Sequence, residues 1–554
     1  MPPEFTHAEK VLEFSRILDL LQAECETEPG AVLAHSLRAA YDFPTVEARQ
    51  SETAEASRLL DVASLPSLGS VRDVAEACSL AAKGAVLDGA TLYAIGVALS
   101  AFRQLKAALK TRSEEFPRLT ELTQAMPENA QTEGKLLNGL DADGEVRDEA
   151  SADLGRLRQH KRTASKRIID RIQSYTTGKT RDYLSDTVYT QREGRYVIPV
   201  KAEHKGKIRG VVHDTSASGQ TVFVEPEDVL QLANALREAE VAEKAEVSCI
   251  LADLSSRVGA EGGQYRAGLE ALAEFDLILA KAKLAHKSDA QPPHLNRGHH
   301  IKIRAGRHPL LDPAIAIPLT LDLGEDTDGL LITGPNTGGK TVSIKTVGLF
   351  VLMAQCGMWL PASSVYLGPF TQVWADIGDE QSLQQSLSTF SGHIRNIAEA
   401  LNRLEKGGLV LLDEVGAGTD PAEGAALAKA ILLEIQRAGG RVFASTHYGE
   451  LKMFAYNASR FANAAMEFDV KSLRPTYHLI MGAPGASHAL KIAERYGLPK
   501  SVITTAQESA GESHQEVSAM LEKLETAQKH AQRAQSESDR LSHRLSALQK
   551  EYEH

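Results

Sequence analysis

The most constraining feature of the chain is a glycine-rich turn between an apolar run and a stretch with a helical pattern. The turn is Gly334-Pro335-Asn336-Thr337-Gly338-Gly339-Lys340-Thr341. Residues 330–332 are apolar, and residues 342–353 favour a helix. This context directs backbone N–H groups at phosphates, while Lys340 reaches the β- and γ-phosphate oxygens and Thr341 binds Mg²⁺. A plain glycine turn is the alternative, but the flanking pattern favours a nucleoside-triphosphate site.

Two further apolar runs lead into polar residues that suit the same site. Residues 409–412 are typical of a buried parallel strand and end at Asp413 and Glu414. We expect Asp413 to orient Mg²⁺ and Glu414 to polarise the water that attacks the γ-phosphate. Residues 441–445 lead to His447, a candidate γ-phosphate sensor. The alternatives are two surface acids at a strand end and an ordinary loop histidine.

Two segments near these strands narrow the type of ATPase. Residues 386–391 form a hydroxyl-rich helix start that suits an anion, although a simple N-cap is the alternative. Residues 416–421 form a rigid turn. In dimeric ATPases of the ABC type, such a turn lies between the sites of the two subunits.

Several segments together resemble the MutS family. Four segments resemble motifs of the ATPase of that family: residues 334–341, 388–391, 413–421 and 445–448. Residues 307–311 resemble the entry motif that precedes it. Outside the ATPase, residues 195–201 and 213–219 resemble the second bacterial MutS type, which is associated with recombination control and ribosome rescue. The resemblance runs through nearly the whole chain.

The resemblance implies a head-to-head homodimer with shared ATP sites. Ser388 would bind the γ-phosphate of the ATP held by the partner subunit, and Asn336 would lie near that junction. Ile315 lies where the family packs an apolar side chain against adenine. Ala314 stands at the place of the aromatic neighbour found in mismatch-repair members, which implies weaker base stacking.

The chain also departs from mismatch-repair members. It has no Phe-x-Glu motif near the N-terminus, and Phe223-Val224-Glu225 is interpreted as a strand end before Pro226. Full-length relatives continue into a Smr nuclease domain, whereas this sequence stops at His554 without a Leu-Asp-x-His or His-Gly-x-Gly motif. We therefore expect a fragment of a longer protein, with any nicking activity carried by other residues.

The sequence predicts a multidomain fold. It combines an all-α core and lever arms, a small β-rich tip, an α/β P-loop domain of the ABC type and a C-terminal coiled coil. The expected domains are a helical core over 1–147, clamp arms over 148–286 with the tip at about 187–224, the ATPase with dimerisation helices over 287–510, and the coiled coil over 511–554. A heptad pattern from Val517 to Tyr552 supports the coiled coil, and a single exposed helix is the alternative.

Charge is unevenly distributed along the chain. The net charge is −12, but residues 156–209 contain 15 Lys and Arg against 5 Asp and Glu. Such a segment can neutralise nucleic-acid phosphates on an acidic protein, although a solvated helix face is the alternative. Lys201, Lys205, Lys207 and Arg209 are the candidate contacts, and lysines of this kind predict phosphate binding with little base reading.

The composition indicates a cytoplasmic protein. The four cysteines are scattered and form neither a metal-ligand spacing nor an evident disulfide framework. The N-terminus lacks the pattern of a signal peptide, and no apolar run approaches the length of a membrane span.

Two functions remain open at this stage. One is an ATP-gated clamp that binds branched DNA or recombination intermediates and suppresses homologous recombination. The alternative is a clamp on collided ribosomes that contacts rRNA and splits the subunits. Basic charge on the arms suits DNA and rRNA equally. A transporter ATPase is a third option, which the long arms disfavour.

Overall fold

The chain divides into two compact units, which are described separately. A computed structural model describes residues 4–192, 194–335, 338–378, 386–469, 474–482, 493–494 and 497–509, and the single residues 527, 534 and 541. Unit 1 comprises Met1–Glu26, Gly30–Ser64 and Glu274–His554, and unit 2 comprises Thr27–Pro29 and Leu65–Ala273. The predicted coiled coil therefore lies almost entirely outside the described residues.

A six-stranded sheet forms the centre of unit 1, in the order β10-β11-β12-β8-β13-β14. The bounds are β8 Gly329–Thr333, β10 Val373–Asp376, β11 Leu409–Leu412, β12 Arg441–Ser445, β13 Phe461–Asp469 and β14 Arg474–Met481. Neighbours from β10 to β13 run parallel, and β14 pairs antiparallel with β13. Every residue of β8, β10, β11 and β12 is buried, as in a parallel sheet with both faces covered.

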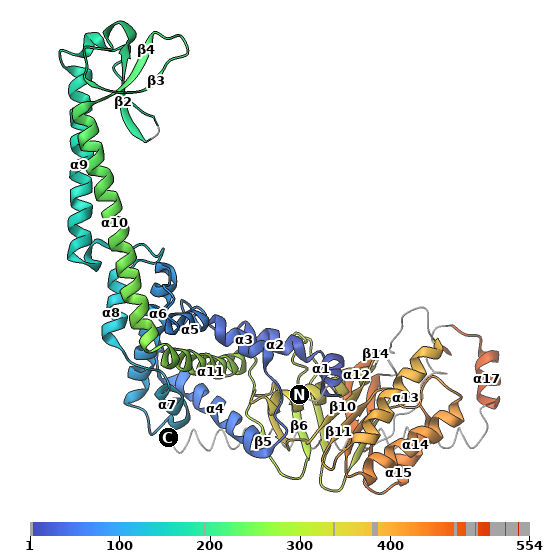
Figure 1. The fold of residues 1–554 in the computed structure, drawn as a ribbon. Coiled ribbons are helices and arrows are strands. Elements are labelled where there is room, and N and C mark those ends of the chain that lie inside the picture. The colour runs from blue at the N-terminus through green and yellow to red at the C-terminus, as the bar shows by residue number, and fades with distance from the viewer. Residues whose placement is uncertain are drawn as a thin grey trace. The chain divides into compact units, whose positions relative to one another are not determined.

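Helices supply the cover on both faces of this sheet (Figure 1). They are α12 Lys340–Gln355, α13 Ser386–Arg403, α14 Pro421–Arg437 and α15 Gly449–Asn457. Leu409 and Leu411 share a core with α12, whereas Val410 and Leu412 share a core with α13, α14 and α15. This alternation follows from the two-residue period of a strand. These elements form an α/β part of the mixed helix-and-sheet fold that the sequence predicted.

The N-terminal helices of unit 1 pack against the six-stranded sheet. They are α1 Glu4–Val11 and α2 Phe14–Gln22, and the buried Leu12, Ile17 and Leu21 belong to the same core as β8 and α12. A Cβ on Gly348 would lie 2.6 Å from Leu12 Cδ2 and 2.6 Å from Leu411 Cδ1. A side chain at residue 348 would therefore disturb this packing.

Other elements complete unit 1. They are α4 Phe43–Val62, α17 Lys500–Ser509 and a sheet in the order β5-β9-β6-β7, with β5 His294–Leu295, β6 Ile301–Gly306, β7 Leu319–Leu323 and β9 Ser364–Leu367. Two helices run from one unit into the other, α3 Glu28–Ser36 and α11 Gly262–Lys287. The sequence suggested one helical core over 1–147, whereas the structure divides these helices between the two units.

Unit 2 contains the predicted pair of long helices, α9 Ala152–Thr177 and α10 Glu227–Ala260, which lie side by side (Figure 1). Shorter helices precede them: α5 Ala75–Ala82, α6 Gly89–Lys110, α7 Pro117–Gln124 and α8 Ala130–Gly139. Acidic residues of α10 pair with basic residues of α9. Glu243 Oε1 accepts from Arg158 Nε at 2.9 Å, and Glu243 Oε2 accepts from Lys161 Nζ at 2.7 Å.

A four-stranded antiparallel sheet forms the tip of the long helices, in the order β1-β2-β4-β3. The strands are β1 Thr190–Arg192, β2 Arg195–Lys201, β3 Gly210–Thr215 and β4 Thr221–Pro226. Ile168 and Ile172 of α9 share a core with Ile198, Val200 and Val224 of the sheet. These strands lie at the segment over about 187–224 for which the sequence predicted β structure.

Two sequence-based expectations concern the chain as a whole. Cys25, Cys78, Cys249 and Cys356 are all free thiols, as their spacing suggested. Among the described residues, no helix combines the length and the apolar character that crossing a membrane requires.

Candidate functional site

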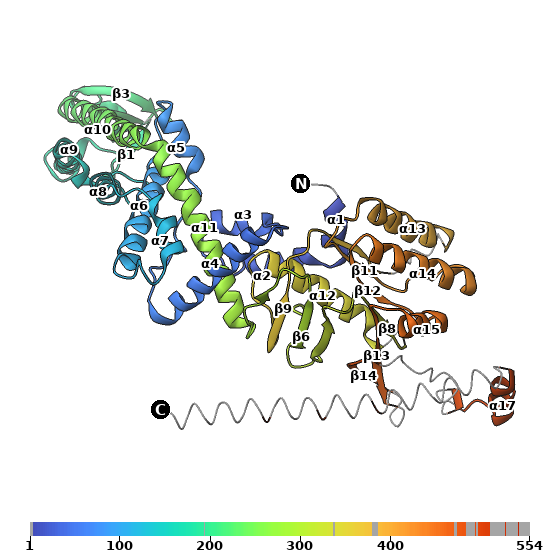
Figure 2. The same cartoon turned by 90° about the horizontal axis from the view of Figure 1, so that it is seen from below.

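The strand order brings the three predicted site segments to one edge of the six-stranded sheet. β12 lies between β11 and β8, with Leu412 opposite Ala444 and Ala444 opposite Leu331. The turn after β8, the acids after β11 and the histidine after β12 thus follow the carboxyl ends of adjacent parallel strands. The three strands lie next to one another in Figure 2. Ligands bind at the carboxyl ends of the strands in open α/β sheets.

The glycine-rich turn has the backbone expected of a phosphate loop. Gly334 and Gly339 have φ values of 131° and 95°, which favour glycine, and α12 begins at Lys340. The carbonyl of Pro335 accepts from the N–H of Gly338 at 3.0 Å. Asn336 and Thr337 lie outside the described residues. α12 therefore begins directly after the glycine-rich turn, and the N-terminus of a helix is a position that favours an anion.

Lys340 is buried, and its surroundings have opposing effects on its pKa. Lys340 is 1% exposed. Burial lowers the pKa of Lys340, while the negative charges of Glu414 and Asp413 act to raise it. A buried ammonium group beside two carboxylates suits a polyanion with a bound divalent cation, because the added phosphate charge compensates the lysine.

Thr341 and Asp413, the two residues proposed from the sequence as magnesium ligands, are in direct contact. The Thr341 hydroxyl donates to Asp413 Oδ2 at 2.6 Å. A hydroxyl and a carboxylate oxygen are hard donors of the kind that Mg²⁺ prefers. Within the described ranges, no group of three or more His, Cys, Asp or Glu side chains could hold a metal. The donor set thus fits a cation held by one carboxylate, one hydroxyl and substrate phosphates rather than a cage made only of protein.

Glu414 has an unusual backbone conformation. Its φ is 50°, in the left-handed region that non-glycine residues rarely adopt. Its N–H donates to Ser445 Oγ at 2.8 Å, and its carbonyl accepts from Ala417 N–H at 3.0 Å. Such strain persists only where neighbouring contacts impose it, and it concentrates at functional sites.

His447 is exposed and lies two residues after the end of β12. Its ring centroid lies 4.4 Å from that of the buried Tyr448, whose hydroxyl donates to the carbonyl of Gly416 at 3.0 Å. The histidine segment is thus attached to the turn over 416–421. Both segments belong to the site edge, as the sequence predicted.

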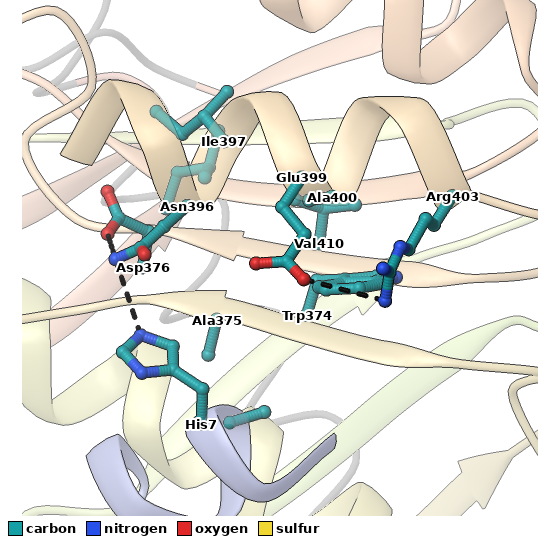
Figure 3. A pocket seen from close by; sticks show the side chains of 12 residues that line it. His7, Trp374, Ala375, Asp376, Asn396, Ile397, Glu399, Ala400, Arg403 and Val410 are labelled. Atoms are coloured by element: carbon teal, nitrogen blue, oxygen red, sulfur yellow. Dashed lines mark hydrogen bonds and ion pairs between the residues drawn. The ribbon is translucent and has the colours of Figure 1, made fainter. Parts of the chain in front are cut away.

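The middle of α13 is held next to the end of β10. Asp376, at the end of β10, is buried and accepts from His393 Nδ1 at 2.8 Å and from Asn396 Nδ2 at 3.1 Å. Its carbonyl accepts from the N–H of Asp413 at 2.9 Å. Figure 3 shows Asp376 and Asn396 with His7 around a cavity of about 200 Å³. Ser388 lies in the first turn of α13, but its side chain is outside the described part.

Comparison with known proteins decides the family. Residues 330–513 match the model of MutS domain V. The endonuclease MutS2 of Pelotomaculum thermopropionicum is 42% identical over 546 residues, which cover 98% of this chain and 69% of that protein. The chain belongs to the MutS2 family. Endonuclease MutS2 of Symbiobacterium thermophilum is 43% identical over 96% of this chain and 66% of its own length, and that of Exiguobacterium sibiricum is 40% identical over 96% and 68%.

One residue near the phosphate loop of this MutS2-family chain escaped the sequence reasoning. A Cβ on Gly339 would lie 3.1 Å from Tyr477 Cδ1, so the ring of Tyr477 lies against the loop. Tyr477 has a φ of 61° and is 49% exposed. It belongs to a bulge of β14 opposite Glu467. The sequence alone does not indicate that Tyr477 lies beside the loop, because the position of its ring depends on the bulge in the pairing of β13 and β14. Ile315, the predicted base contact, is 70% exposed.

The predicted nucleic-acid residues belong to the tip in unit 2. Lys205, Lys207 and Arg209 are exposed, and none of them takes part in an ion pair with the described residues. Lys201 Nζ donates to the carbonyl of Asp182 at 3.1 Å. The basic segment over 156–209 therefore has two parts. Arg158 and Lys161 of α9 form ion pairs with acidic residues, whereas the three exposed residues of the tip do not.

The Phe223-Val224-Glu225 segment lies at the C-terminal end of β4, immediately before its last residue Pro226. The side chain of Glu225 is fully buried, and its Oε2 lies 2.7 Å from His213 Nε2. Such a buried carboxylate cannot reach a DNA base, which agrees with the interpretation of the segment as a strand end.

Proposed function

We propose that this MutS2-family chain hydrolyses ATP with Mg²⁺ and uses the reaction to control its binding to DNA. The convergence of Lys340, Thr341, Asp413 and Glu414 at one sheet edge is the observation that carries the proposal. These four residues provide the phosphate, metal and water contacts that phosphoryl transfer requires.

Each residue has a defined part in the proposed reaction. Bound Mg²⁺ neutralises charge on the phosphate oxygens. Lys340 binds those oxygens, and Thr341 and Asp413 hold the cation. Glu414 orients a water molecule and accepts its proton at a carboxylate oxygen, and His447 contacts the γ-phosphate from the end of β12.

Each ATP site is shared between two copies of the chain. The first turn of α13 carries Ser388, and the contacts of Asp376 with His393 and Asn396 fix this helix next to the strand of Asp413. The N-terminus of a helix suits a γ-phosphate presented by the partner subunit. The proposed assembly is a homodimer.

Tyr477 contributes the aromatic contact for the nucleotide. Its ring lies beside Gly339, is half exposed and is held by a strained backbone. An exposed aromatic ring next to a phosphate loop suits stacking on a base or packing on a ribose. This contact offsets the absence of an aromatic side chain at Ala314.

DNA is the proposed macromolecular ligand. The exposed basic side chains of the tip supply phosphate contacts, which carry most of the affinity of sequence-independent binding. The relatives are named endonucleases, a class of enzymes that act on nucleic acids. Branched DNA, as formed during recombination, is the proposed substrate.

Two measurements on the purified chain test the proposal. The first is Mg²⁺-dependent ATP turnover, whose absence would contradict the enzymatic part. The second compares binding of a four-way DNA junction, a linear duplex of equal length and ribosomal subunits at one stated salt concentration. Preference for the junction supports the DNA proposal, whereas preference for ribosomal subunits contradicts it.

A further inference from the structure

A buried serine at the end of β12 contacts both acids of the proposed ATP site. Ser445 is 0% exposed. Its hydroxyl lies in hydrogen-bond contact with Asp413 Oδ1, and it accepts from the N–H of Glu414 at 2.8 Å. The two contacts use the one donor and one of the acceptor positions of the hydroxyl.

The direction of these hydrogen bonds is fixed by chemistry. An ionised Asp413 can only accept, and the backbone N–H of Glu414 can only donate. The order is therefore Glu414 N–H to Ser445 Oγ, and Ser445 Oγ–H to Asp413 Oδ1. Thr341 donates to the other carboxylate oxygen, Oδ2. Both oxygens of Asp413 are thus restrained, which sets the plane of the carboxylate.

Ser445 also restrains the backbone of Glu414 from both sides. The N–H of Glu414 donates to the Ser445 hydroxyl, and the N–H of Val415 donates to the Ser445 carbonyl at 3.1 Å. Glu414 lies between these two bonds with a φ of 50°. A left-handed glutamate requires such support, since the conformation itself is unfavourable.

We infer that Ser445 is a positioning residue for the ATPase reaction, which orients the metal ligand Asp413 and the water-orienting Glu414 through one hydroxyl. The inference rests on the proposed ATPase function. It assigns to β12 a second role, because the same strand end leads to His447 two residues later. Loss of the hydroxyl removes one donor to Asp413 and leaves the N–H of Glu414 buried without this acceptor.

The test is the Mg²⁺ dependence of ATP turnover in Ser445→Ala. We expect kcat to fall roughly tenfold to hundredfold, the usual range for removal of a hydrogen bond to a charged group. The Mg²⁺ concentration for half-maximal rate should rise, while KM for ATP changes little because Lys340 and the loop backbone are intact. Ser445→Thr restores a hydroxyl and should recover most of kcat and the wild-type Mg²⁺ dependence.

A matched control removes another buried hydroxyl of unit 1. Thr346 is 2% exposed and donates to the carbonyl of Val342 within α12, away from Asp413. Thr346→Val should keep the wild-type Mg²⁺ dependence. Melting temperatures of all variants separate lost stability from lost positioning, and if the extra methyl group of threonine prevents folding, the Mg²⁺ shift of Ser445→Ala decides alone.

The outcomes separate this inference from the proposed function. If the wild-type chain shows no Mg²⁺-dependent hydrolysis, the proposed function fails. If the wild-type chain is active but Ser445→Ala retains its half-saturating Mg²⁺ concentration, the positioning role is wrong, whether or not kcat falls.

Discussion

The ATP-site edge of unit 1 and the tip of unit 2 both present positive charge, but they do so in opposite ways. Lys340 is 1% exposed, and its neighbours are fixed by hydrogen bonds of known direction. Lys205, Lys207 and Arg209 of the tip are exposed. A buried charge acts strongly on a ligand at one position, whereas exposed charges act weakly and are screened by salt.

This contrast predicts how each region responds to substitution. At the ATP edge, removal of one atom leaves buried polar groups without a partner, which costs far more than an average interaction. At the tip, several side chains share the binding of one phosphate backbone, so each contributes a fraction. Single changes should therefore be severe at the proposed ATP site of unit 1 and mild at the tip of unit 2.

The largest expected effect is at Glu414 and Lys340. Glu414→Ala should lower kcat by about a hundredfold or more and leave ATP binding largely intact, because its carboxylate acts on water and not on ATP. Lys340→Ala should weaken ATP binding itself. Turnover assays combined with equilibrium binding of ATP check both expectations. Turnover of Glu414→Ala at the wild-type rate would show that another group orients the water.

A smaller effect is expected when two inactive variants are mixed. Lys340→Ala and Ser388→Ala subunits can form a heterodimer with one intact composite site, so turnover should recover to about a quarter of the wild-type value after random exchange of a two-fold dimer. Mass measurements on differently tagged subunits check the exchange. Full exchange without recovery would contradict the sharing of the site.

The sequence predicted the motifs of this edge better than their supports. The phosphate loop, Asp413, Glu414 and His447 are recognisable because each follows an apolar run at fixed spacing. Ser445, Asp376 and Tyr477 are not recognisable in this way. Their roles depend on the order β10-β11-β12-β8 and on a bulge of β14, which are set by pairing between distant segments.

A similar limit applies to the fold. The long helices α9 and α10 and the tip strands were predicted, because helical and strand periodicity extends over many residues there. The grouping of α1 and α2 with the six-stranded sheet was not predicted, since it depends on long-range packing around Gly348 and Leu12.

The tip should respond in proportion to the number of charges removed. Replacing Lys201, Lys205, Lys207 and Arg209 by Gln should weaken DNA binding for all sequences alike. It should also flatten the dependence of log K on log salt by about one unit for each phosphate that the protein no longer neutralises. A single replacement should have about a quarter of this effect. Binding isotherms at several salt concentrations check the slope.

A matched control removes positive charge elsewhere in unit 2. Lys83 and Lys110 are exposed and lie outside the tip, so their replacement by Gln should change the slope little. ATP turnover without DNA should survive in all of these variants. An unchanged affinity and slope in the fourfold variant would identify the basic segment as a solvated surface.

The smallest expected effect concerns an exposed ion pair in unit 1. It tests whether the exposure of a charged side chain, and not the unit in which it lies, determines how much its removal costs. In unit 1, hydrogen bonds from Lys345 of α12 and from Arg16 lower the pKa of Glu13 from 4.5 to about 2. The side chain of Glu13 is 41% exposed, and its Oε1 lies 2.7 Å from Lys345 Nζ. Because the folded pKa is lowered, the stabilisation is present above about pH 4.5 and is lost as the pH falls towards 2.

Glu13→Gln should therefore lower the free energy of unfolding near neutral pH by less than about 1 kcal/mol, the range of exposed ion pairs. It should also weaken the loss of stability of the wild type between pH 4.5 and 2. Chemical denaturation at a series of pH values measures both. A cost of several kcal/mol at neutral pH would mean that this exposed pair acts like the buried groups of the ATP edge, and exposure would no longer explain the contrast between the two regions.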